Sequence, residues 1–221
     1  MRLMLAVALA VCGLVVTPGV ARPVPGHCPP ICDAIPDSAW IAPSSIPLFP
    51  VYRWPGLAGV AVTATTPRFG FEEWCAGGPA AADEPRDYSV AARAMVPSPA
   101  GQWNLRAQVI HWRGDTVTGG GTALEVLEKA RLALRTCQDS AAGISPSITT
   151  SDAERLATVI SDGGRRVMHA YLLADPGSST VVELALWATV PVLVEWPAVP
   201  DAQVFDALAA PLCAAYLGSC R

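Results

Sequence analysis

The sequence predicts an α+β fold: one twisted antiparallel sheet with two main helices packed mainly on one face, a proline-rich N-terminal arm and disulfide bracing. Three observations lead to this class. Strand-like segments are joined by turn signals rather than alternating regularly with helices, which disfavours a parallel sheet. Two other segments carry apolar residues at helical spacing. The 221-residue chain is 52% hydrophobic and 15% charged, which excludes intrinsic disorder and suffices for one core.

The first 21 residues have the three-part layout of a secretory signal peptide. Arg2 is followed by an apolar run over residues 3–16 and then by small residues at Gly19 and Ala21. The run is shorter than the roughly twenty residues that span a bilayer. We therefore expect cleavage near Ala21 and a protein that is secreted or held in the cell envelope without a stable membrane span. A retained N-terminal anchor is the alternative.

The cysteines that follow the expected cleavage point are Cys28, Cys32, Cys75, Cys137, Cys213 and Cys220. An even number in an exported chain is typical of disulfides, although the number does not fix the connectivity. Proximity favours one bridge within each terminal pair and Cys75–Cys137 as a long-range bridge. The alternative for the first pair is a metal or redox site. Its spacing does not match the usual zinc and redox motifs, so we expect neither a metal nor a cofactor.

Residues 22–56 hold nine of the 21 prolines, which excludes long helices and central strands there. The same stretch contains large apolar residues such as Trp40, Ile46 and Trp54, too many for a free linker. We expect an ordered, extended arm that lies over the domain and is held there by its aromatic residues. Residues 57–221 then form a single domain.

Apolar and β-branched segments bounded by turn residues predict six strands. They cover residues 57–65, 88–96, 103–112, 155–161, 166–174 and 180–189. Residues 97–101 join the second and third strands as a hairpin. Glycine-containing turns at residues 162–164 and 175–178 make the last three strands an antiparallel meander.

The clearest helix covers residues 122–137, where apolar side chains recur every three or four positions. Thr122 and Glu125 have the spacing of a capping box, which predicts that the helix begins at Thr122. The final helix is expected from Asp201 to about residue 217. Residues 114–121 have the glycine spacing of a phosphate loop but lack its lysine, so we interpret them as a flexible turn.

Motifs for catalysis are absent from the sequence: there is no Gly-x-Ser-x-Gly, Ser-x-x-Lys or His-Glu-x-x-His. Glu183 interrupts an apolar strand and would pair with His169 if the last two strands are in register. Such a buried acid–imidazole pair, with Ser179 as the accompanying nucleophile, is the one catalytic arrangement the sequence suggests. A structural pair, or two exposed residues, is the alternative.

Aromatic residues and net charge bear on the kind of ligand. Trp74, Trp103 and Trp112 are candidates for a ligand cleft, because aromatic faces stack on apolar surfaces of ligands such as sugars. Core packing is the alternative for each of them. The formal charge of −4 gives no basic footprint for a nucleic acid, so we expect no nucleic-acid partner.

Three stretches, at residues 27–33, 46–56 and 147–152, resemble uncharacterised exported proteins of actinobacteria, of mycobacterial type. This resemblance covers essentially the whole mature chain and implies no activity and no site residues. The order of elements around the helix that ends in Cys137 also resembles the extracellular sensor domains of actinobacterial serine/threonine kinases. That topological resemblance implies a disulfide-braced α+β domain with a ligand-binding cleft.

These observations favour a secreted, disulfide-stabilised binding or interaction module without catalysis. We expect a cleft between the sheet and the arm that holds an apolar or envelope-derived ligand, or a protein of the envelope. The alternatives are a secreted hydrolase acting on envelope material and a purely structural envelope protein. The hydrolase hypothesis requires that His169 and Glu183 lie on the same face of the sheet.

Overall fold

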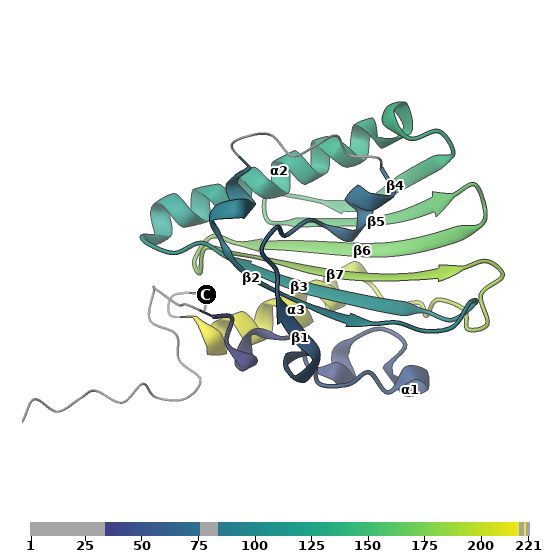
Figure 1. Ribbon diagram of the computed structural model, residues 1–221, viewed down its shortest axis with the longest axis horizontal. Helices are drawn as coiled ribbons and strands as arrows, with labels where there is room; N and C mark the ends of the chain where they lie inside the picture. Colours follow the sequence, from purple (N-terminus) through teal and green to yellow (C-terminus); the bar gives the residue numbers. More distant parts are fainter. Residues whose placement is uncertain (1–33, 76–83, 217–218, 220–221) are drawn as a thin grey trace, which may run out of the picture.

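The computed structural model describes residues 34–75, 84–216 and 219, and Figure 1 shows how their elements are arranged. The described residues form one seven-stranded antiparallel sheet with the order β1-β2-β3-β7-β6-β5-β4. Its strands are β1 (Ala61–Thr63), β2 (Val90–Val96), β3 (Asn104–His111), β4 (Ile144–Ser151), β5 (Arg155–Asp162), β6 (Arg166–Asp175) and β7 (Thr180–Thr189). The predicted α+β class, the hairpin of β2 with β3 and the β5–β6–β7 meander are confirmed.

The two long helices, α2 (Thr116–Ser140) and α3 (Asp201–Ala215), lie on opposite faces of the sheet (Figure 1). This corrects the expectation that both lie mainly on one face. Neighbouring side chains of a strand point to opposite faces, and on β3 Ile110 packs with α2 whereas Val109 packs with α3. Because the central strands are apolar on both sides, each face needs its own cover.

The described part of the arm is ordered and lies on the same face as α3. It forms short turns rather than one extended segment: η1 (Asp37–Ala39), η2 (Pro43–Ser45) and α1 (Phe49–Tyr52), and η3 (Leu57–Val60) follows it directly. Trp40, Ile46 and Trp54 are buried in one core with α3 and the sheet. The arm is therefore part of the hydrophobic core, as its aromatic content predicts.

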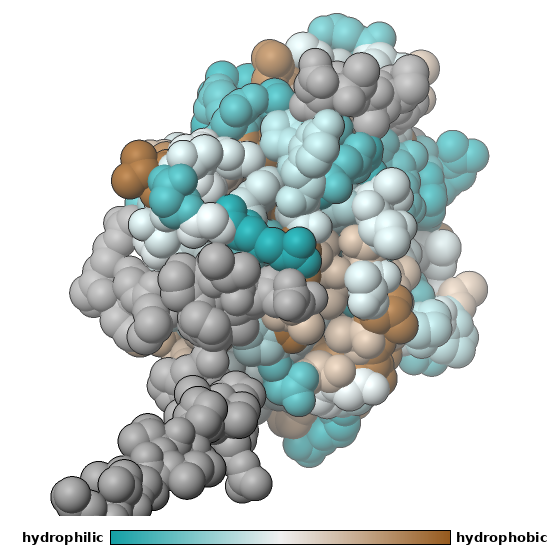
Figure 2. Space-filling model, turned by 60° about the vertical axis from the view of Figure 1, so that its left-hand side comes forward, coloured by the Kyte–Doolittle hydropathy of each residue, from teal (hydrophilic) through white to brown (hydrophobic). Residues whose placement is uncertain are grey.

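The two edges of the sheet differ from the prediction. Residues 57–60 form a 3-10 turn, so β1 is only three residues long. Strand β4 was not predicted, because its serines, threonines and Pro146 resemble a loop; proline is tolerated there because β4 is an edge strand. Figure 2 shows hydrophobic side chains gathered low on one face of the molecule. In β1 the side chain of Val62 is 66% exposed.

Helix α2 begins six residues earlier than predicted. Asp115, not Thr122, caps it: its carboxylate accepts a hydrogen bond from the Thr118 N–H at 2.8 Å. The predicted capping box at Thr122 is wrong, since the Thr122 hydroxyl donates to the Thr118 carbonyl within the helix. Gly119, Gly120 and Gly121 are helical and the first two are buried, so residues 116–121 are not the flexible turn that was predicted.

A disulfide joins Cys75 to Cys137, as predicted, and ties the segment after β1 to the C-terminal half of α2. Cys213 is also disulfide-bonded. The bridges expected within the terminal pairs involve Cys28, Cys32 and Cys220, which lie outside the described residues, as does the expected signal peptide. In the described ranges no helix has the length and hydropathy to span a bilayer.

The remaining short turns, η4 (Gly70–Glu73) and η5 (Pro85–Tyr88), lie on the α2 side of the sheet. They belong to the connection between β1 and β2. We call residues 67–75 the covering segment, because Phe69 and Phe71 pack there into the core shared with α2.

Candidate functional site

A mostly apolar groove of about 360 Å³ lies between the arm and the connection from β7 to α3. Ligand pockets in proteins range from about 300 to 1,000 Å³, so its size suits a small ligand. Eight of the twelve lining residues are apolar. The lining consists of Ser44, Ser45, Ile46, Pro47, Leu48, Pro50 and Val51 of the arm, Val194, Glu195, Pro197 and Val199 of the connection, and Gln203 of α3.

The wall formed by the β7–α3 connection is held by aromatic contacts. Trp103 Nε1 donates a hydrogen bond of 2.7 Å to the carbonyl of Val194, a groove residue. Trp196 stacks on the His169 ring with centroids 3.7 Å apart, and Trp103 meets the same ring edge-on at 5.7 Å. Two of the predicted ligand-cleft residues, Trp103 and His169, are thus brought together behind this wall.

The opposite wall is held by the arm's own aromatic residues. The Trp103 backbone N–H donates to the Tyr52 hydroxyl at 3.0 Å, and Tyr52 stacks on Trp54 at 4.7 Å. Trp54 Nε1 in turn donates to the Pro47 carbonyl at 2.8 Å. Trp103 therefore anchors both walls of the groove, which fixes their separation.

His169 contributes an aromatic surface rather than a charge. Burial lowers its pKa to about 4, and the negative charge of Asp201 only partly opposes this effect. At neutral pH the ring is neutral, which suits its stacking between two tryptophans. Its ring contacts in the described residues are the stacked Trp196 and the edge-on Trp103.

The structure does not bring His169 and Glu183 together. In the β6–β7 register His169 lies opposite Leu186, whereas Glu183 lies opposite Leu172, three residues further along β6. An odd offset places the two side chains on opposite faces of the sheet. Ser179 shares the Glu183 face but lies at the end of β7, against Gly119 of α2. The hydrolase hypothesis therefore loses the constellation on which it depended.

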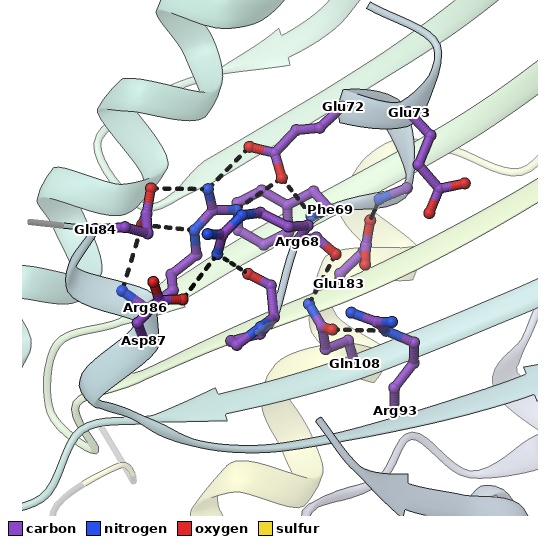
Figure 3. A network of polar contacts seen from close by, with 12 residues as sticks. Arg68, Phe69, Glu72, Glu73, Glu84, Arg86, Asp87, Arg93, Gln108 and Glu183 are labelled. Carbon is purple, nitrogen blue, oxygen red and sulfur yellow. Dashed lines mark hydrogen bonds and ion pairs between the residues drawn. The ribbon is translucent and has the colours of Figure 1, made fainter. Parts of the chain in front are cut away.

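Glu183 instead lies beneath the covering segment, and Figure 3 shows its carboxylate pointing at the backbone of that segment. Its side chain is fully buried; Oε1 accepts a hydrogen bond from the Gly70 N–H at 2.5 Å, and Oε2 lies 3.2 Å from Arg106 Nε. Burial raises the pKa of Glu183, while the Arg106 charge and the Gly70 N–H oppose the rise. Arg106 also pairs with Glu73 at 2.9 Å.

A second set of ion pairs, centred on Arg86 of η5, also holds the covering segment in place (Figure 3). Arg86 binds Glu72 and Glu84, each at 2.8 Å, and its guanidinium lies 4.9 Å above the Phe69 ring. These carboxylates were assigned no role from the sequence. The signal that was missed was Arg106, a charged residue that stands between the apolar residues Leu105 and Ala107 in β3.

The other tryptophans suggested as ligand-cleft residues are in the core on the α2 side. Trp112 is buried, and its Nε1 donates to the Pro85 carbonyl at 2.9 Å. Trp74 is buried beneath the Arg166 guanidinium, 4.4 Å from its ring. Both tryptophans are core residues, which was the alternative to a role in a ligand cleft, and neither lines the groove.

A second hollow, also of about 360 Å³, lies beside α3 and carries three carboxylates in its lining, those of Glu154, Asp175 and Asp206. Asp175 is already engaged, since it accepts hydrogen bonds from the hydroxyls of Ser178 and Ser219. The groove between the arm and the β7–α3 connection is the better candidate, because its apolar walls match the usual lining of a ligand site.

A comparison with protein-family models and one with curated proteins both find no match for this chain. Among residues 34–75, 84–216 and 219, no group of three or more His, Cys, Asp or Glu side chains is placed to hold a metal ion.

Proposed function

We propose that the protein is an exported binding module and that the groove between the arm and the β7–α3 connection holds a small, predominantly apolar ligand. The observation that carries the proposal is the groove itself: about 360 Å³, with walls formed mainly by proline, valine, leucine and isoleucine. Burying apolar ligand surface against such walls provides the driving force for binding.

The walls of the groove are held rigidly, which supports the proposal that the groove binds a ligand. Both walls are fixed through Trp103, by one hydrogen bond to Val194 and one from its backbone to Tyr52. A preformed site loses little conformational entropy when a ligand enters, so more of the contact energy appears as affinity.

The proposal of export rests on the sequence of residues 1–21 and on the six cysteines that follow. The buried bridge between Cys75 and Cys137 is compatible with an oxidising compartment. The proposal excludes a catalytic role for the groove, whose lining holds one carboxylate, Glu195, and no second titratable side chain.

The test is titration of the full chain with Nile red, an uncharged dye that fluoresces in apolar surroundings. We expect saturable binding with one site per chain. Val51 lines the groove and is 58% exposed, so Val51→Glu should not disturb folding. Because it places a charge where the apolar dye must sit, we expect it to weaken dye binding about tenfold or more.

The matched control is Val117→Glu, which adds the same charge at an 85%-exposed position on α2, across the sheet. It should leave the dye affinity unchanged. Absence of saturable binding to the unmodified chain, or equal loss in both variants, would overturn the proposal.

A further inference from the structure

We infer that the groove selects a ligand with a cationic head group, an ammonium on an apolar body, and discriminates against the same body with a carboxylate. This inference rests on the proposed function and adds the chemical class of the ligand. Its basis is the charge of the lining: Glu195 is the one ionisable side chain, and neither arginine, lysine nor histidine lines the groove.

Glu195 is available to a ligand. It lies on the exposed side of the β7–α3 connection and has no ion-pair partner among the described residues. Its neighbours on either side, Val194 and Trp196, are anchored through Trp103 and His169. The carboxylate is therefore carried on a segment held in place from both sides, at the edge of an apolar hollow.

The remaining polar groups of the lining are neutral: the hydroxyls of Ser44 and Ser45 and the amide of Gln203. Each can accept a hydrogen bond as well as donate one. An ammonium has three donors and no acceptor, so these groups can satisfy it together with Glu195. A ligand with a carboxylate head group would be repelled by Glu195 and would find no cationic side chain in the lining of the groove.

Two features could favour an anion, and neither does so here. The N-terminus of α3 adjoins the groove, but Asp201 already places a carboxylate in its first turn, where the helix dipole is positive. Arg53 follows α1 along the chain, but its guanidinium lies over the Phe49 ring, 5.5 Å from the centroid, and does not line the groove.

The experiment compares three twelve-carbon probes that differ only in the head group: dodecylammonium, dodecanol and dodecanoate. Each displaces Nile red from the full chain at pH 7.5, below its micelle-forming concentration. We expect dodecylammonium to bind about five- to tenfold more tightly than dodecanoate. This is the difference expected if one partly exposed carboxylate, Glu195, attracts the ammonium head group and repels the carboxylate head group. Dodecanol should lie between them.

Glu195→Gln keeps the shape and hydrogen-bonding capacity of the side chain and removes its charge. We expect it to reduce the preference to about twofold or less while leaving dodecanol binding unchanged. Glu125→Gln is the matched control: it removes one exposed carboxylate from α2, on the other face of the sheet, and should preserve the full preference.

The outcomes separate this inference from the proposed function. If none of the probes nor the dye binds, the proposed function fails. If dodecanol and the dye bind but dodecanoate equals or exceeds dodecylammonium, the groove is a ligand site and the charge selection is wrong. A preference that survives Glu195→Gln, or disappears equally in Glu125→Gln, overturns the assignment to Glu195.

Discussion

Individual buried charges decide how the covering segment is attached to the sheet. Arg106 of β3 and Glu183 of β7 are both almost fully buried. The Glu183 carboxylate accepts a hydrogen bond from the Gly70 N–H, and the Arg106 guanidinium donates hydrogen bonds to the Arg68 carbonyl and to the Glu73 carboxylate. The two residues thus replace the water that the backbone of the covering segment would otherwise bind, and they fix its position on the α2 side.

We expect Arg106→Met to lower the free energy of unfolding by about 3–5 kcal/mol, because it leaves the Glu183 carboxylate buried without its counter-charge. The measurement is urea unfolding followed by tryptophan fluorescence and circular dichroism. Adding Glu183→Leu to this variant should recover part of the loss, since the unpaired charge is then gone.

Glu73→Gln is the matched control at the same guanidinium. The Glu73 side chain is 69% exposed, so its ion pair with Arg106 should contribute at most about 1 kcal/mol. Similar losses in Glu73→Gln and Arg106→Met would show that burial of the Glu183 charge is not the cause.

At the scale of elements, the first turns of α2 show why its glycines are needed. A Cβ added to Gly120 would lie 2.5 Å from the Pro176 carbonyl oxygen in the β6–β7 turn, and one added to Gly119 would lie 2.5 Å from the Ser179 hydroxyl. Gly121 faces open space. The helix therefore approaches the turn more closely than any residue with a side chain would allow.

Gly120→Ala should destabilise the protein by about 1–3 kcal/mol, because the obstacle is backbone and cannot rotate away. Gly121→Ala, its neighbour in the same helix, should stabilise by about 0.5–1 kcal/mol through better helix propensity. Midpoints of thermal unfolding for the two variants give the comparison. Stabilisation by both substitutions would contradict the close approach of α2 to the turn.

At the scale of the whole molecule, the Cys75–Cys137 disulfide connects distant parts of the chain. Cys75 ends the covering segment and Cys137 lies in the last part of α2, 62 positions further along the sequence. Cross-linking so long a loop restricts the unfolded chain, and the restriction stabilises the folded state.

Replacing both cysteines, in the variant Cys75→Ser with Cys137→Ser, should lower the free energy of unfolding by about 4 kcal/mol on the loop-entropy model. Urea unfolding of the purified variant gives the value. Native-like circular dichroism in buffer, with an earlier midpoint, is the expected result. An unchanged midpoint would mean that contacts of α2 with the sheet hold this region without the bridge.

Local features of the sequence determined much of the fold. Periodicity and turn residues predicted the β2–β3 hairpin, the β5–β7 meander and the core of both helices, because these signals lie within a few neighbouring residues. The proximity of the other cysteines to one another predicted Cys75–Cys137 as the long-range bridge, and the aromatic residues of the arm predicted the packing that its described part, residues 34–56, shows. The ends of α2 and the whole of β4 were missed, because glycine and polar residues there gave misleading local signals.

Only the tertiary structure decided which faces and which distant residues meet. The alternation of side chains along paired strands put α2 and α3 on opposite faces and separated His169 from Glu183. The groove depends on the arm and the β7–α3 connection, which lie more than a hundred residues apart and meet through Trp103. Such contacts depend on strand register and packing, which no local pattern encodes.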